Sequence, residues 1–286
     1  MPSTFTIMSV QGRPHAWDPA ATLVRVEREV LAYRRTFPHV DLYLYPEMFL
    51  AAEDPWTGSA PPGYEAEVAE PIPGPTTERL AALARRVRRW ICAGSMLERS
   101  GRSVYNTALL FSPRGELVVR YRKVFPWMPF ETTARGTEPP AVFAIPRVGA
   151  FGVYICYDGW FPEMSRSLAL RGAEVILHPT LTTTADREQE IVLARANAIA
   201  NQCYVLNVNS VPAVGGGRSV GVDTNGRILF ELGHEEGFAI ETIDLELVRA
   251  VRREGTVGLN RVLEHLREAP TAVFEPYRDL LRRKRG

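Results

Sequence analysis

The alternation of helical and strand-like segments is the feature that most constrains the fold of this 286-residue chain. Residues 20–37 carry apolar side chains at helical spacing, and they lead into the hydrophobic segment 40–47. The second half repeats this order, with strand-like and helical segments in turn at 151–156, 162–171, 174–178, 186–202 and 204–209. Because strands that alternate with helices are typical of crossover units, this pattern predicts an α/β fold.

Two groups of shorter strands add antiparallel neighbours to this pattern. Segments 90–97 and 104–112 have strand composition and are separated by a turn at Ser100-Gly101-Arg102. A hairpin is expected over residues 219–232, with its turn at Thr224-Asn-Gly226. We therefore expect mixed sheets in which parallel and antiparallel pairs both occur.

One domain is the economical description of the chain. A Pro/Gly-rich stretch at 54–75 is typical of a surface loop, and Thr76-Thr-Glu78 after it predicts the cap of a helix that runs to about Arg89. No internal repeat or low-complexity linker divides the sequence. We expect a single domain over 1–286, with 265–286 as a C-terminal arm.

The charge balance favours a small-molecule substrate. The chain has 34 Lys and Arg against 33 Asp and Glu, so a net charge of +1 gives no global field for nucleic acid or an anionic membrane. Its first ten residues form a short strand pattern without the charged head and apolar core of a signal peptide, and no long uncharged apolar run follows. The sequence predicts a cytoplasmic protein that binds neither nucleic acid nor membrane.

The cysteines argue against disulfides and metal binding. Cys92, Cys156 and Cys203 are an odd number without a CxxC pair, which disfavours a disulfide framework and a cysteine-rich zinc site. Neither a dinucleotide nor a P-loop fingerprint appears. We therefore expect no metal and no cofactor. Cys92 and Cys203 lie in or beside apolar strands, where a cysteine is usually a small buried hydrophobe.

Three reactive side chains follow hydrophobic segments. Cys156 ends the strand-like run that begins at Phe151, Glu47 ends the run that begins at Val40, and Lys123 follows 117–122. Catalytic groups gather at the carboxyl edge of α/β sheets, because a rigid scaffold positions the loops there. A thiol, a carboxylate and an amine are therefore predicted to meet at one site.

The motifs around these three side chains resemble the nitrilase (carbon–nitrogen hydrolase) superfamily. The motifs are Tyr45-Pro-Glu47, Tyr121-Arg-Lys123 and Ile155-Cys-Tyr-Asp-Gly-Trp-Phe-Pro-Glu163, in family order. The resemblance extends over nearly the whole chain. It implies an αββα sandwich that pairs as an αββα–αββα homodimer, often within a larger homo-oligomer.

The resemblance also implies a catalytic role for each group. Cys156 would be the nucleophile, and Glu47 the base that takes its proton, since a free thiol is only a few per cent ionised at neutral pH. Lys123 and the backbone N–H of Tyr157 would stabilise the tetrahedral oxyanion. The implied reaction cleaves a small carboxylic amide to an acid and ammonia through a Cys thioester.

A second glutamate narrows the substrate class. Residues 123–131 are similar to the Lys-x-x-Pro-Trp-x-Pro-x-Glu segment of amidases and formamidases in this superfamily, where the glutamate corresponding to Glu131 helps to position the amide. After Glu131 the sequence departs from the amidase pattern. Trp127, Phe130 and Trp160 are candidates for lining a roomier, aromatic-tolerant pocket.

His178 follows a strand and precedes a proline, so it could approach the substrate, although a satisfied wall histidine is the alternative. Cys156-Tyr-Asp158 favours an amide over a nitrile, because nitrilases proper usually carry Cys-Trp-Glu. Carbamoyl-cleaving members share Cys-x-Asp, so N-carbamoyl amidohydrolase stays open beside nitrilase. Amide-dependent acyl transfer is an alternative, in which an amine or alcohol captures the thioester. A non-catalytic module would have no chemical need for the four reactive residues together.

Overall fold

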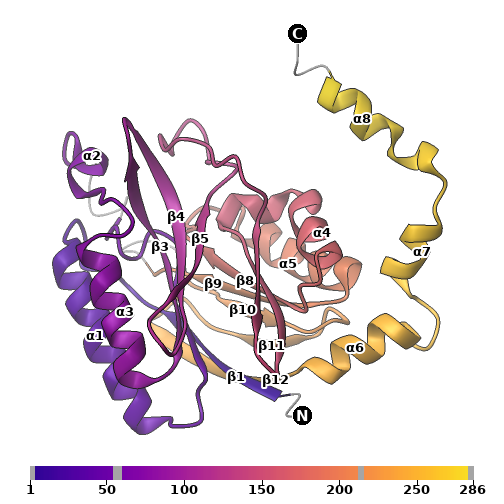
Figure 1. Ribbon diagram of the computed structural model, residues 1–286, viewed down its shortest axis with the longest axis horizontal. Helices are drawn as coiled ribbons and strands as arrows, with labels where there is room; N and C mark the ends of the chain where they lie inside the picture. Colours follow the sequence, from indigo (N-terminus) through magenta and orange to yellow (C-terminus); the bar gives the residue numbers. More distant parts are fainter. Residues whose placement is uncertain (1–3, 54–59, 212–215, 283–286) are drawn as a thin grey trace.

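The computed structural model describes residues 4–53, 60–211 and 216–282, in which two six-stranded sheets pack face to face between outer helices (Figure 1). This layering confirms the predicted αββα sandwich. Each sheet mixes parallel and antiparallel pairs, and each has three adjacent parallel strands. The two halves of the chain therefore repeat one arrangement, as the alternation of segments indicates.

The first sheet combines the N-terminal half with one late strand. Its strands, in order across the sheet, are β12 (Gly237–Asp244), β1 (Thr4–Gln11), β2 (Leu42–Leu44), β3 (Trp90–Ser100), β4 (Ser103–Phe111) and β5 (Leu117–Arg122). β1, β2 and β3 are parallel, whereas β12, β4 and β5 join antiparallel. Helices α1 (Pro19–Thr36) and α3 (Pro75–Val87) cover the outer face of this sheet (Figure 1).

The second sheet comes from the C-terminal half. Its order is β11 (Ile228–Glu231), β10 (Val220–Val222), β9 (Tyr204–Asn209), β8 (Val175–Thr180), β7 (Gly149–Val153) and β6 (Ala141–Ile145). β7, β8 and β9 are parallel. Helices α4 (Pro162–Leu170) and α5 (Arg187–Asn201) pack on its outer face (Figure 1).

The core explains why the central strands are apolar on both faces. In and just after β2, Leu42 and Leu44 point into the cluster between the two sheets, while Tyr43 and Tyr45 point to the cluster under α1 and α3. Alternate side chains of a strand face opposite sides, so a strand between two buried layers needs apolar residues throughout. Burying one such large apolar side chain stabilises the fold by about 1.5–3 kcal/mol.

Two local predictions are corrected by the structure. The stretch expected to be a surface loop contains the short helix α2 (Tyr64–Val68), whereas its residues 54–59 lie outside the described part of the chain. α3 begins at Pro75 after Gly74, and the Thr77 hydroxyl accepts a hydrogen bond from the Gly74 N–H at 2.8 Å. The cap thus starts earlier than the predicted Thr76-Thr-Glu78, because proline suits the first helical position.

The C-terminal region follows β12 as α6 (Leu245–Glu254), α7 (Val262–Glu268), a 3-10 helix (Thr271–Phe274) and α8 (Glu275–Arg282). Figure 1 shows α7 and α8 reaching away from the sandwich, with 283–286 outside the described residues. Phe274 and Tyr277 on this arm are exposed. The pairing of two sandwiches stays a prediction, because the structure contains one chain.

None of the helices in the described residues is long and apolar enough to cross a membrane.

Candidate active site

Glu47, Lys123 and Cys156 converge at one edge of the two sheets. β2 ends three residues before Glu47 and β7 three residues before Cys156, whereas Lys123 follows β5 directly. The prediction that the strands extend to Glu47 and Cys156 is therefore wrong, since both segments leave the sheet first. These short departures place the carboxylate and the thiol on turns that point them towards the amine.

Contacts with both sheets hold Glu47. Its side chain is 4% exposed, and its backbone N–H donates to the Thr180 carbonyl, on β8 of the other sheet, at 3.3 Å. The N–H of the next residue, Met48, donates to the Ser95 hydroxyl at 2.8 Å. Hydrogen bonds to both sheets thus fix the backbone that carries the Glu47 carboxylate.

A glycine in β3 makes this position of Glu47 possible. The β3–β4 register shifts between Cys92 and Ser95, and Gly94 within this shift has φ +68°. A Cβ added at Gly94 would stand 1.7 Å from the Pro46 carbonyl oxygen. Since Pro46 directly precedes the catalytic candidate, the absence of a side chain at Gly94 allows the close approach of the two segments.

We expect Gly94→Ala to lower the free energy of unfolding by at least about 3 kcal/mol, because backbone strain and an unavoidable clash add together. Urea denaturation measures this change. Gly101→Ala is the matched control, since Gly101 also has a positive φ, +62°, but an added Cβ meets nothing within 4 Å. Its expected cost is about 1 kcal/mol. Equal losses in the two variants would contradict the close-approach argument.

Lys123 is enclosed between two carboxylates. Its Nζ lies 2.8 Å from Glu47 Oε1 and 2.6 Å from Glu131 Oε2, and its side chain is 2% exposed. Burial alone lowers the pKa of Lys123, but the negative charges of Glu47 and Glu131 outweigh this and raise it well above its ordinary value. The amine is therefore a fixed positive charge at neutral pH.

The two glutamates differ in their electrostatic state. Burial raises the pKa of Glu47, with Lys123 acting against this shift and Glu131 adding to it. Burial also raises the pKa of Glu131, but the charge of Lys123 and its hydrogen bond lower it more, so the pKa of Glu131 lies below its ordinary value. Glu47 is thus the better proton acceptor of the pair, whereas Glu131 stays ionised.

Asn106 completes this network, and the sequence did not single it out. Its Nδ2 donates to Glu47 Oε1 at 2.8 Å and to Glu131 Oε1 at 3.0 Å. Its backbone carbonyl accepts from the Lys123 N–H at 2.9 Å. Asn106 lies on β4, beside β5. The turn Pro113-Arg-Gly115, which joins the segment 104–112 to the strand before Lys123, is the sequence signal that could have placed it near Lys123.

The nucleophile candidate occupies a sharp turn. Cys156 begins a 3-10 helix (Cys156–Trp160) and has φ +44°, a conformation that costs energy for a residue with a side chain. The carboxylate of Asp158 accepts from the Ile155 N–H at 3.1 Å, the Phe125 N–H at 2.9 Å and the Tyr121 hydroxyl at 2.7 Å. Buried Asp158 therefore fixes the turn to the segment that carries Lys123.

Cys156 is a neutral thiol at rest. Burial raises its pKa well above the ordinary value, the Glu47 charge adds to this, and Lys123 acts against it. Its Sγ lies 3.8 Å from the Thr182 hydroxyl. A thiol in this state needs a base to become a nucleophile, and Glu47, whose charge acts on the Cys156 pKa, is the candidate for that base.

His178 lies behind the nucleophile. Its Nε2 is 2.9 Å from the Cys156 carbonyl oxygen, and its Nδ1 is 2.9 Å from Asn207 Nδ2. Because the Asn207 amide nitrogen donates, Nδ1 accepts and the Nε2–H donates to Cys156. Burial lowers the pKa of His178 to about 4, so the ring is neutral. This buried ring supports the backbone of Cys156, as expected of a wall histidine.

A small pocket of about 30 Å³ opens beside the thiol. Trp127, Tyr157 and Trp160 line it together with Cys156 and the segment Leu181-Thr-Thr-Thr184, as does Asp186. Phe130 is not among these lining residues; it is 75% exposed and stacks on Trp127 with ring centres 4.9 Å apart. The structure therefore places Trp127 and Trp160, two of the three predicted aromatic residues, at the nucleophile beside Tyr157, and leaves Phe130 on the outside.

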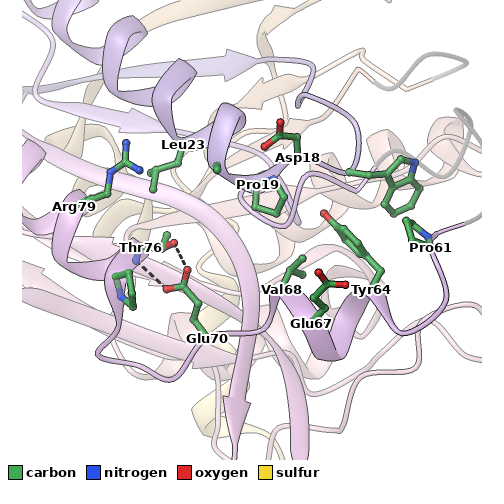
Figure 2. A pocket seen from close by; sticks show the side chains of 13 residues that line it. Asp18, Pro19, Leu23, Pro61, Tyr64, Glu67, Val68, Glu70, Thr76 and Arg79 are labelled. Carbon is green, nitrogen blue, oxygen red and sulfur yellow. Dashed lines mark hydrogen bonds between the residues drawn. The ribbon is translucent and has the colours of Figure 1, made fainter.

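A larger pocket, of about 520 Å³, lies elsewhere, between α1, α2 and the start of α3 (Figure 2). Its walls include Trp17 and Tyr64, but none of the four candidate catalytic residues. Within it, Glu70 accepts hydrogen bonds from the N–H and hydroxyl of Thr76. We place the reaction at the small pocket, because only a site that contains the thiol can support covalent chemistry.

The described residues contain no group of three or more His, Cys, Asp and Glu side chains placed to hold a metal ion. The expectation that activity needs no metal stays a prediction.

Comparison with known proteins identifies the family. A family model described as carbon–nitrogen hydrolase matches residues 6–253, so the chain belongs to the carbon–nitrogen hydrolase family. Among curated proteins, a formamidase of Bacillus cereus is 36% identical over 140 residues. That match covers 48% of this chain and 42% of the relative.

Solved structures extend the likeness over the whole sandwich. Nit3 of Saccharomyces cerevisiae, a member of branch 10 of the nitrilase superfamily, superposes with a TM-score of 0.77 at 25% identity, covering 87% of this chain and 93% of its own. An amidase from Nesterenkonia sp. gives a TM-score of 0.73 at 27% identity, with coverages of 87% and 94%. The predicted membership of the nitrilase superfamily, near its amidase and formamidase members, is confirmed.

Proposed function

We propose that the protein is an amidohydrolase that cleaves a small carboxylic amide to an acid and ammonia. The observation that carries this proposal is the buried network in which Lys123 contacts both Glu47 and Glu131 beside the Cys156 turn. This arrangement can promote attack of a thiol on an unreactive carbonyl, because it supplies a base, a fixed positive charge and a second carboxylate. The similarity to formamidases and amidases supports the same reaction class.

The first half of the reaction forms the thioester. Glu47 takes the Sγ proton as Cys156 attacks the amide carbon, and a carbon–sulfur bond forms. Lys123 and the N–H of Tyr157 stabilise the negative oxygen, since the first N–H groups of a helix have no partner within it. Glu47 then returns the proton to the nitrogen, the carbon–nitrogen bond breaks, and ammonia leaves.

The second half regenerates the enzyme. Glu47 removes a proton from water, whose oxygen attacks the thioester carbon, and the carbon–sulfur bond breaks. The sulfur recovers its proton from Glu47 as the acid leaves. Glu131 remains charged throughout and orients the amide, in keeping with its lowered pKa and its contact with Lys123. One carboxylate thus moves protons while the other positions the substrate.

The pocket composition favours an amide over an N-carbamoyl amino acid. Such a substrate carries a carboxylate, and none of the residues that line the pocket beside Cys156 is basic. Lys123 is already engaged by two carboxylates. Nitrile hydrolysis and acyl transfer would use the same thioester chemistry, so product analysis has to separate them from amide hydrolysis.

A released-ammonia assay over formamide, aliphatic amides, aryl amides, ureido acids and nitriles tests the proposal. We expect turnover with small amides and none with ureido acids. Adding hydroxylamine and comparing hydroxamate with free acid distinguishes hydrolysis from acyl transfer. Ammonia from nitriles alone, or hydroxamate as the main product at low hydroxylamine, would overturn the proposed reaction.

Glu131→Gln should slow amide turnover by about 10²-fold or more, because the substitution keeps the volume but removes the charge that positions the amide. Steady-state kinetics on the best amide measures this loss. Alkylation of Cys156 by iodoacetamide should persist, since the thiol, Lys123 and Glu47 are all left in place.

Glu65→Gln is the matched control for Glu131→Gln. It also removes a carboxylate from this region, where Glu65 accepts a hydrogen bond from Thr132, one residue after Glu131. Its turnover should stay within about twofold of the parent enzyme. Unchanged turnover in Glu131→Gln would reduce Glu131 to a loop carboxylate and would favour carbamoyl or nitrile chemistry.

A further inference from the structure

We propose that the natural substrate is a short amide whose acyl group carries a positive charge, and that Asp186 binds this charge. The inference rests on the proposed amide hydrolysis and adds the substrate class. Asp186 lines the pocket that contains Cys156, together with the hydroxyl-bearing segment Thr182-Thr-Thr184. The lining residues therefore include one carboxylate, several hydroxyl groups and no basic side chain.

The Asp186 carboxylate is not used to cap its helix. Asp186 occupies the N-cap position of α5, where an aspartate commonly accepts a backbone N–H, yet its side chain makes no capping hydrogen bond. It accepts instead from the hydroxyl of Thr184, which also lines the pocket. This bond orients the carboxylate and leaves its charge intact.

Neighbouring cations are engaged by other groups. Arg187 contacts Glu190 at 2.5 Å and donates to the Arg218 carbonyl at 2.6 Å. Arg218 pairs with Glu188 and Glu231. Across residues 4–53, 60–211 and 216–282, Asp186 takes part in no salt bridge within 4 Å. Its negative charge thus remains available to a ligand.

The surrounding charges also favour a cation. The positive end of the α5 dipole faces this region, but Asp186 opposes it, while the first-turn residues Glu188 and Glu190 are paired with Arg218 and Arg187. Glu47 and Glu131 add two carboxylates against the single amine of Lys123. An anionic acyl group would meet net negative charge here, whereas a cation is attracted.

The aromatic rings and the small volume of the pocket beside Cys156 define the rest of the site for the acyl group. Trp127, Tyr157 and Trp160 line the same pocket, and faces of such rings attract organic cations. The volume of about 30 Å³ is small, so the pocket favours short acyl groups over long or branched ones. A short chain ending in an ammonium group suits the charge of the lining.

Three amides of similar size test the inference: 3-aminopropanamide is cationic, butanamide is its neutral counterpart, and malonamate is anionic. A mutant of the Nesterenkonia sp. amidase was solved in complex with butyramide, so the neutral compound is a suitable reference for this fold. We expect kcat/KM for 3-aminopropanamide to exceed that for butanamide by about tenfold, and malonamate to be the poorest substrate.

Asp186→Asn should bring the ratio of kcat/KM for 3-aminopropanamide over butanamide to about one, since asparagine can still accept from Thr184 but carries no charge. Glu188→Gln is the matched control. It removes a charge two residues along the same helix, where the side chain is 71% exposed and paired with Arg218, so the ratio should persist.

The outcomes separate the inference from the proposed function. Equal or better hydrolysis of butanamide by the parent enzyme, or an unchanged ratio in Asp186→Asn, would overturn the charge-recognition inference while amide hydrolysis stands. Failure of every amide to release ammonia would overturn the proposed function and the inference with it.

Discussion

Cys156→Ala should lower amide turnover by at least about four orders of magnitude, because alanine cannot form the proposed thioester and has no group to replace the nucleophile. The fold should persist, since alanine is smaller and the turn is held by the Asp158 carboxylate. Cys156→Ser should also be inactive, because Glu47 is too weak a base for a serine hydroxyl. Released ammonia under substrate saturation measures the loss.

Cys203→Ala is the matched control for the nucleophile. Cys203 is also a free cysteine, and it is fully buried in the hydrophobic core. Its loss should reduce stability by about 1 kcal/mol through a small cavity and leave catalysis in place. In the parent enzyme, acid quenching during turnover should add an acyl mass to the peptide containing Cys156. Turnover of Cys156→Ala within tenfold of the parent would end the covalent mechanism.

Glu47→Gln should slow turnover by about 10²–10⁴-fold, because the amide side chain keeps its volume and can accept from Lys123 but cannot take a proton. The reactivity of the Cys156 thiol towards alkylation should increase, although turnover decreases. Burial and the Glu47 charge raise the pKa of Cys156 and Lys123 lowers it, so removing the carboxylate charge should lower the pKa of the thiol. The pH at which iodoacetamide alkylation is half-maximal should therefore move down while turnover falls.

This pair of readouts distinguishes a catalytic base from a structural carboxylate. A structural role would lower alkylation and turnover together, with loss of the folded state in urea denaturation. A mid-point of alkylation that moves up in Glu47→Gln would contradict the electrostatic arrangement. Turnover within tenfold of the parent would show that another group takes the thiol proton.

Local patterns in the sequence were sufficient for the element types near the site. The apolar runs before Glu47, Lys123 and Cys156 predict strands, and β2, β5 and β7 lie there. The ends of β2 and β7 were predicted too late, at Glu47 and Cys156. Each chain segment leaves the sheet three residues earlier, because the turn that orients the reactive side chain needs residues that pair with no neighbouring strand. The Cys156 turn has φ +44°, a conformation that no local apolar pattern predicts.

Positions set by contacts between distant segments were not predictable in the same way. Asn106 joins Glu47 and Glu131 from 59 and 25 residues away, and His178 supports Cys156 from 22 residues away. The strands β6 and β12 carried no pattern strong enough to be singled out, although both complete sheet edges. Whether such a segment forms an edge strand depends on the strand that lies beside it, and this neighbour is set only in the folded sheet.

The sequence by itself determined the reactive groups and their order, because hydrophobic periodicity and the residues that end each segment act over a few positions. It also determined the family, through motifs that keep this order. Only the tertiary structure decided which groups touch: Lys123 meets Glu47 across 76 residues of chain, and Asp186 faces the Cys156 pocket rather than capping α5. These contacts require the two sheets to pack, since packing brings the distant turns to one edge.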